Sequence, residues 1–285
     1  MTVVGSLTLR RVQRHTLPDG RRPPPIETTE YIQADRKREE HRGYAGYSVG
    51  RHGRDIYRPA PRTARITRCD LRQRFLVNFD DREYTAWPLQ VFPTREEMLA
   101  CADAAPQSPV QLAPTVLVEI ETVDTGERRE LFGRTARHVI TTRRVIPLTG
   151  STRQESHTVT DGWYIDLDTS VSCEPWWWSS RSGHAHAFAS IERVGEQPPV
   201  PPVPTFKDIG EPERGYALLS RSTTDGNVFE VEVTHLSTAA IDPSLFDVPP
   251  NFSLVEWIRQ EPVPPLVIRA KLMFDRFKRL SRKFT

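Results

Sequence analysis

The residues best placed for chemistry are two pairs whose members lie two positions apart. His184 and His186 would share one face of a strand, as would Asp166 and Asp168, because side chains alternate along a strand. Two imidazoles supply half of a typical zinc site, and two carboxylates are able to form an acid–base couple. No spacing adds further ligands to the histidines, and no nucleophile accompanies the aspartates. We therefore expect no metal site, no cofactor and no catalytic residue, and we predict that the protein is not an enzyme.

Three consecutive tryptophans form the most unusual stretch of the chain. Trp176, Trp177 and Trp178 follow Pro175 and precede a segment rich in serine, which places them in or beside a loop. Neighbouring side chains of an extended segment point to opposite faces, so the three indoles do not all enter one core. Two interpretations stay open. The indoles form a rim or lid against an apolar ligand or a membrane, or they cap the open end of a sheet and pack under a loop.

The composition argues against a protein that binds nucleic acid. The 285 residues include 39 basic and 37 acidic ones, for a net charge of +2, which is far from the basic surface that nucleic acids require. An apolar share of 37% and a charged share of 27% suit a sheet with one solvated face. The sequence contains no run of about twenty apolar residues, so it predicts no transmembrane helix.

The three cysteines leave the disulfide state open. Cys69, Cys101 and Cys173 are an odd number, and no two of them have the spacing of a metal-binding pair. One pair, such as Cys69 with Cys173, could form a bridge in an oxidising compartment. We favour the simpler interpretation that the thiols are buried or idle.

Alternating apolar residues predict strands along most of the chain. Val116, Val118 and Ile120 share one face of an extended segment, as a strand with one buried face requires. The triplet Asp-Thr-Gly at 124–126 then predicts the turn of a hairpin that ends at Val145. Similar patterns predict strands or hairpins at 6–16, 65–87, 161–168 and 216–236. The polar segment at 27–43 suits a helix or a strand, and its Thr, Tyr and Ile residues favour a strand.

These patterns predict a mainly β fold with a curved, mostly antiparallel sheet and two helices. A short internal helix is expected at Thr94–Ala105, where Thr94 and Glu97 form a capping box. The second helix is amphipathic and lies at the C-terminus. We divide the chain into a sheet domain, residues 1–256, and a Pro-rich linker with the C-terminal helix, residues 257–285.

Three landmarks carry a resemblance to a known family. They are the hairpin at 122–142, the segment Asp-Gly-Trp-Tyr-Ile-Asp-Leu at 161–167, and the closing segment at 233–252 with its Leu-Phe-Asp-Val-Pro. Together they resemble bacterial envelope proteins of the DUF4412 and outer-membrane lipoprotein carrier (LolA/LolB-like) superfamily, which close on Leu-Phe-x-Val-Pro. The resemblance covers residues 6–256.

The resemblance implies an open half-barrel whose apolar concavity holds a lipid acyl chain in the bacterial cell envelope or periplasm. We therefore expect non-enzymatic binding of a lipid-like or apolar ligand on the concave face. The first residues show no signal-peptide pattern, so a cytoplasmic location is also compatible with the sequence. The residues expected to face inward and line the concavity are Phe75, Val77, Phe79, Val116, Val118, Ile120, Phe229, Val231 and Val233.

The alternative is an interaction or scaffold module with a filled core, whose C-terminal helix binds a membrane or a partner protein. Between Leu266 and Phe284 apolar residues recur at spacings of four and three, as on one stripe of a helix, and seven basic residues and one acidic residue surround them. Such a helix suits an anionic membrane or an acidic groove, or it docks on its own sheet. The residues expected to contact a membrane or partner are Arg269, Lys271, Arg276, Phe277, Lys278, Arg279 and Lys283.

We predict that the full chain sediments with liposomes containing anionic lipid and that a version ending at Pro262 does not. Each basic residue near an anionic surface contributes about 1 kcal/mol, and salt screens this attraction. Binding should therefore weaken as salt is added. Equal sedimentation of both versions, or sedimentation that ignores lipid charge, would mean that the helix packs on its own domain.

Overall fold

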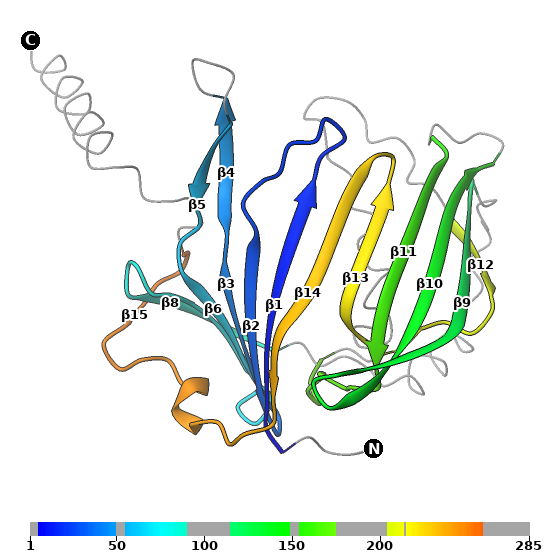
Figure 1. Cartoon of the computed structure of the whole chain (residues 1–285). Coiled ribbons are helices and arrows are strands. Elements are labelled where there is room, and N and C mark those ends of the chain that lie inside the picture. Colours follow the sequence, from blue (N-terminus) through cyan, green and yellow to red (C-terminus); the bar gives the residue numbers. More distant parts are fainter. Residues whose placement is uncertain are drawn as a thin grey trace, which may run out of the picture.

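The structure is a computed structural model, and it describes residues 5–49, 55–89, 115–148, 154–174, 204–213 and 215–258 (Figure 1). These residues form strands and one short 3-10 helix, η1. The elements are β1 (Leu7–Thr16), β2 (Ile26–Gln33), β3 (Arg36–Arg42), β4 (Tyr44–Val49), β5 (Asp55–Pro59), β6 (Thr63–Arg68), β7 (Gln73–Asn78), β8 (Glu83–Pro88), β9 (Val116–Leu131), β10 (Arg134–Pro147), β11 (Ser156–Ile165), β12 (Pro204–Ile209), β13 (Tyr216–Thr224), β14 (Asn227–Ser237), η1 (Pro243–Phe246) and β15 (Ser253–Leu254).

Thirteen of the strands form one large sheet that is mixed, mostly antiparallel and not closed (Figure 1). Their order is β12-β9-β10-β11-β13-β14-β1-β2-β3-β6-β7-β8-β15. The mainly β, mostly antiparallel fold predicted from the sequence is thus confirmed. The sheet is not antiparallel throughout, because each edge strand runs parallel to its neighbour, β12 to β9 and β15 to β8.

Pairing between β1 and β14 holds two meanders together. Strands β1, β2, β3, β6, β7 and β8 follow one another in the sheet, and so do β9, β10 and β11, with β13 and β14 completing the second half. Leu9 pairs with Leu236, and Thr8 pairs with Ser237, more than 200 residues away in sequence. The predicted hairpin at 216–236 is confirmed as β13 and β14, whose turn contains Asp225 and Gly226, both with positive φ.

The turn expected at 124–126 is absent, because β9 runs straight through this triplet. His138 of β10 instead faces a bulge, since Arg137 pairs with Arg128 and Val139 pairs with Asp124. Asp124 accepts a hydrogen bond from the backbone N–H of Gly126, whose φ is +82°. The triplet therefore forms a bulge within β9 and does not reverse the chain. The hairpin turns at Phe132 and Gly133, where both residues have positive φ, as a two-residue turn requires.

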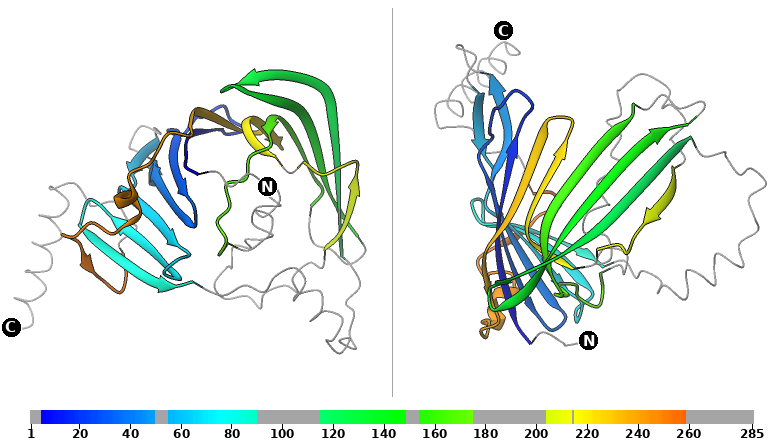
Figure 2. Two further views of the ribbon diagram at one scale, coloured as in Figure 1. Left: turned by 90° about the horizontal axis from the view of Figure 1, so that it is seen from below. Right: turned by 45° about the vertical axis from the view of Figure 1, so that its right-hand side comes forward.

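The sheet bends, and irregular segments cover both of its sides. Figure 2 shows the segment after β11 on the inner side of the bend and the segment that contains η1 on the outer side. We call these sides the inner face and the outer face. The inner core contains Leu7, Leu9, Ile32 and Val171, and the outer core contains Ile66, Val77, Ile241 and Phe246. Packing on both faces differs from the single wet face that the composition suggested.

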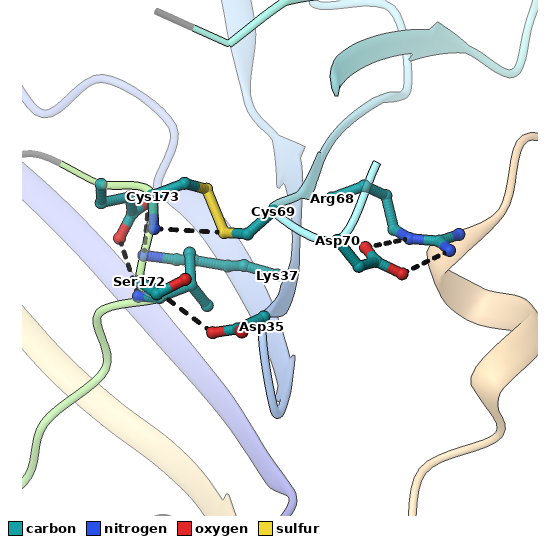
Figure 3. The surroundings of a disulfide bond; sticks show 9 residues. Asp35, Lys37, Arg68, Cys69, Asp70, Ser172 and Cys173 are labelled. Atoms are coloured by element: carbon teal, nitrogen blue, oxygen red, sulfur yellow. Dashed lines mark hydrogen bonds and ion pairs between the residues drawn. A yellow bond between two sulfur atoms is a disulfide. The ribbon is translucent and has the colours of Figure 1, made fainter. Parts of the chain in front are cut away.

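Arg68 fastens η1 to the outer face. Its Nε and Nη2 atoms each donate a hydrogen bond to the Asp70 carboxylate at 2.8 Å, and its Nη1 atom donates to the Asp247 carboxylate next to η1. Hydrogen bonds from Arg68 lower the pKa of Asp70 to about 2, because they stabilise the charged carboxylate. Figure 3 shows the Arg68–Asp70 pair beside Cys69.

Several sequence predictions concern residues outside the part that the structure describes. These are the internal helix at 94–105, the tryptophans Trp176, Trp177 and Trp178, and the C-terminal helix with its basic residues. They stay predictions. Among the described residues, no helix is long and apolar enough to cross a membrane.

Candidate functional site

Charged side chains occupy the part of the inner face where an apolar concavity was expected. The strand registers place them on one face, since Lys37 pairs with Ile32, Glu39 with Arg65, and Arg74 with Thr67. Glu174 reaches the same place from the segment after β11. We call the group the inner-face charged cluster, and its members are Arg11, Glu30, Lys37, Glu39, Arg65, Arg74 and Glu174.

Most of these side chains make ion pairs, and three of them are shielded from water. Glu30 lies 3.3 Å from Arg11 and 3.8 Å from Lys37, and Lys37 lies 3.5 Å from Glu174. The side chains of Glu30, Lys37 and Glu174 are only 4%, 9% and 10% exposed. A buried charge is tolerated when it is paired, and removal of one partner leaves the other uncompensated. Glu174 must therefore stay against the sheet, because Lys37 would otherwise lose a partner for its buried charge.

A disulfide joins Cys69 to Cys173 (Figure 3), the residue directly before Glu174. Cys69 follows β6, and Cys173 is the residue before Glu174, so the bridge ties the second meander to the first across 104 residues. The backbone N–H of Ser172 also donates to the Asp35 carboxylate. We call residues 166–174 the clasp segment. The favoured interpretation that these two cysteines are idle thiols is wrong, because the clasp segment brings Cys173 to Cys69 at the end of β6.

The clasp segment fills the inner face with its own side chains. Val171 is buried in the inner core, and Leu167 packs against that core. Burial raises the pKa of Glu174, because a charged carboxylate loses its water there, and the attraction of Lys37 only partly opposes this. Burial likewise lowers the pKa of His41 and raises that of Tyr216. Each shift disfavours a charge on a group that belongs to the inner-face charged cluster or lies beside it.

The predicted ligand-lining residues separate into three places. Val116, Val118 and Ile120 form a buried apolar cluster with Val145 on β9 and β10. Val233 belongs to the inner core, and Val231 is partly buried on the same strand.

Phe229 lies on the same face of β14 as Val231 and Val233, but near the exposed start of the strand. Its side chain is 49% exposed and stacks on His15 with ring centroids 3.9 Å apart.

Phe75, Val77 and Phe79 lie on the outer face, opposite the inner core. Val77 is buried beneath η1, and Phe75 and Phe79 pack around it. Their register explains this, since Phe75 pairs with Ile66, which pairs with Arg38, whereas the neighbouring Lys37 points to the inner face. The sequence correctly placed the three on one face, but it assigned that face to the wrong side. They therefore do not line one concavity with Val233.

The sequence pattern did not predict the inner-face charged cluster. The segment at 27–43 was difficult to interpret because polar residues occur on both faces of its strands. That pattern usually marks an exposed ribbon. Glu30 and Lys37 are nevertheless buried. The available signal was a segment that is polar on both faces and is flanked on both sides by further predicted strands, which would make it central in the sheet.

A shallow depression of about 280 Å³ lies over β1, β11, β13 and β14, apart from the inner-face charged cluster. Trp163 borders it, with its ring under the guanidinium of Arg129 at 4.4 Å and stacked on His138 at 4.9 Å. Because these neighbours already contact the indole, it offers no free stacking platform there. The charged residues around the depression are Arg14, Asp161, Arg221, Glu230 and Glu232.

The described residues contain no group of three or more His, Cys, Asp or Glu arranged to hold a metal ion. Neither a protein-family model nor a curated protein matches this chain. A solved structure of PNGF-II in space group P21 matches with 10% identity and a TM-score of 0.28. The match covers 84% of this chain and 30% of that one. At this TM-score the likeness supports no argument about fold or function.

We predict that replacing both cysteines, Cys69→Ser with Cys173→Ser, lowers the free energy of unfolding by about 2–5 kcal/mol, as expected for a bridge that closes a long loop. Chemical denaturation without reductant measures the change. Reductant should destabilise the native protein by a similar amount and leave the variant unchanged. If reductant affects both proteins alike, the bridge does not hold the clasp segment.

We predict that Glu174→Gln becomes more stable relative to the native protein as the pH rises. The folded-state pKa of Glu174 lies above its ordinary value of 4.5, so the folded state holds this proton more tightly than the unfolded state. Native stability therefore falls as the pH rises from 4.5 through the folded-state pKa. The glutamine side chain of the variant carries no charge and escapes this loss.

Denaturation midpoints of the two proteins, compared below pH 4.5 and at neutral pH, test this prediction. Glu121→Gln, on an exposed side chain of β9, is the matched control for loss of a charge. A variant that loses stability relative to the native protein as the pH rises would contradict it, and would show that the Lys37 pair outweighs burial.

Proposed function

We propose that this protein is a non-enzymatic interaction module of the cell envelope, built on a curved half-barrel sheet whose concave side is occupied by its own chain. One observation carries the proposal. The clasp segment and the inner-face charged cluster fill the inner face of β1, β2, β3 and β6, where a carrier would need an empty apolar groove. A filled face leaves the exposed surfaces and the tail for binding.

The disulfide supports the choice of compartment. Bridges between protein cysteines persist in oxidising compartments and are rare where thiols are kept reduced. The Cys69–Cys173 bridge holds buried charges in place, so the fold would be least stable in a reducing cytosol. The resemblance to envelope proteins implies the same location.

The pairing of the charged groups supports a non-enzymatic role. Catalytic acids and bases need access to a substrate, whereas Glu30 and Lys37 are occupied by each other and by neighbouring cluster members.

A second candidate function is the carriage of a lipid-like ligand. It is favoured by the apolar cluster of Val116, Val118, Ile120 and Val145 on the long strands β9 and β10. This cluster lies far along the sheet from the charged one, so an acyl chain and the clasp segment would not compete for the same strands. The LolA-like resemblance points in the same direction.

Native mass spectrometry of the full protein, isolated without detergent, separates the two functions. We expect the mass of the protein alone, and no saturable binding of fluorescent fatty acids of several chain lengths. Fatty-acid-binding albumin is the positive control. A co-purified lipid, or saturable binding that survives a chelator, would overturn the interaction module in favour of the carrier.

A further inference from the structure

The inner-face charged cluster encloses a small cavity, and one of the side chains that line it has a donor without an acceptor among the described residues. Lys37, Glu39, Arg65, Arg74 and Glu174 line it, and its volume is about 30 Å³. A cavity needs roughly 10–15 Å³ to hold one water molecule. The space therefore admits one small ion or about two waters.

Arg74 is the cavity residue whose hydrogen bonds are not satisfied. Its Nε–H is buried and has no hydrogen-bond acceptor among the described residues. Arginine stays charged at all ordinary pH values and has no acceptor atom of its own. A buried donor without an acceptor costs free energy, and the cost is greater when the donor is charged. The position therefore calls for an acceptor, preferably an anionic one.

The two carboxylates at the cavity are already committed to other cations. Glu39 lies 3.5 Å from Arg65, and Glu174 lies 3.5 Å from Lys37. Three basic side chains thus face two acidic ones. Burial also disfavours the charged form of Glu174, as its raised pKa indicates, which leaves the cavity more positive still. A water molecule would satisfy a donor but would not neutralise this excess.

We propose that the cavity is a binding site for a small monovalent anion, either chloride or the carboxylate group of a small organic acid, held by Arg74 with Lys37 and Arg65 beside it. The Arg65 side chain is 46% exposed, so an ion enters from solvent along it. The bound anion would complete the charge balance beneath the clasp segment. This site is independent of whether the protein is an interaction module or a carrier.

Chlorine NMR line broadening on the full, oxidised protein tests the site directly, with sodium chloride as the probe and the ionic strength held constant. We expect saturable broadening that sodium acetate reverses. Arg74→Gln should weaken chloride binding roughly ten- to hundredfold, the loss expected for one hydrogen bond to a charged group. Arg10→Gln, on an exposed arginine of β1, is the matched control and should bind as the native protein does.

A variant of opposite sign keeps the test valid if Arg74→Gln does not fold. Glu39→Gln removes a carboxylate that competes with the anion, so chloride binding should tighten. Broadening that does not saturate, or affinities that Arg74→Gln and Glu39→Gln leave unchanged, would overturn the proposal. A chloride signal that acetate does not reverse would overturn the carboxylate part and restrict the site to halide.

Discussion

The inner half of the structure depends on one buried amine. Lys37 lies 3.8 Å from Glu30 of the neighbouring strand and 3.5 Å from Glu174 of the clasp segment. A charge so deeply buried is tolerated only while its partners stay in place, so Lys37 requires the clasp segment, and the clasp segment requires an anchor. The Cys69–Cys173 bridge supplies that anchor. Packing, charge and covalent bond therefore act on the same few residues.

On the outer face, Arg68 anchors an irregular segment to the sheet, as Lys37 and the disulfide do on the inner face. Arg68 joins Asp70, beside the disulfide, to Asp247, next to η1, and η1 brings Phe246 down onto Ile66 and Val77. Residues 68–70 thus anchor an irregular segment on each side of the sheet, Cys69 on the inner face and Arg68 on the outer face. A broad open sheet has two faces to cover. In this protein the segments that cover the two faces are both anchored at the turn after β6.

This arrangement changes what the concave side offers a partner. An apolar trough would favour acyl chains along its whole length. The observed inner face is divided instead, with charges and a small cavity near β3 and β6, and the apolar cluster around Val118 on β9 and β10. The charged half suits small polar or anionic groups, because the buried Nε–H groups of Arg11 and Arg74 have no acceptor among the described residues. Any ligand of the inner face would meet these two environments in different places.

The sequence by itself determined that the chain forms strands with alternating faces, including the hairpin at 216–236 and the buried run at Val116–Ile120, since a period of two is a local property. It did not determine which face is inner for Phe75 and Val77, because alternation fixes relative sides only. The turn at 124–126 was misplaced because Asp-Thr-Gly suits a bulge as well as a turn. The buried charged cluster and its disulfide arise only when the clasp segment meets the end of β6, through contacts about a hundred residues apart that no local pattern encodes.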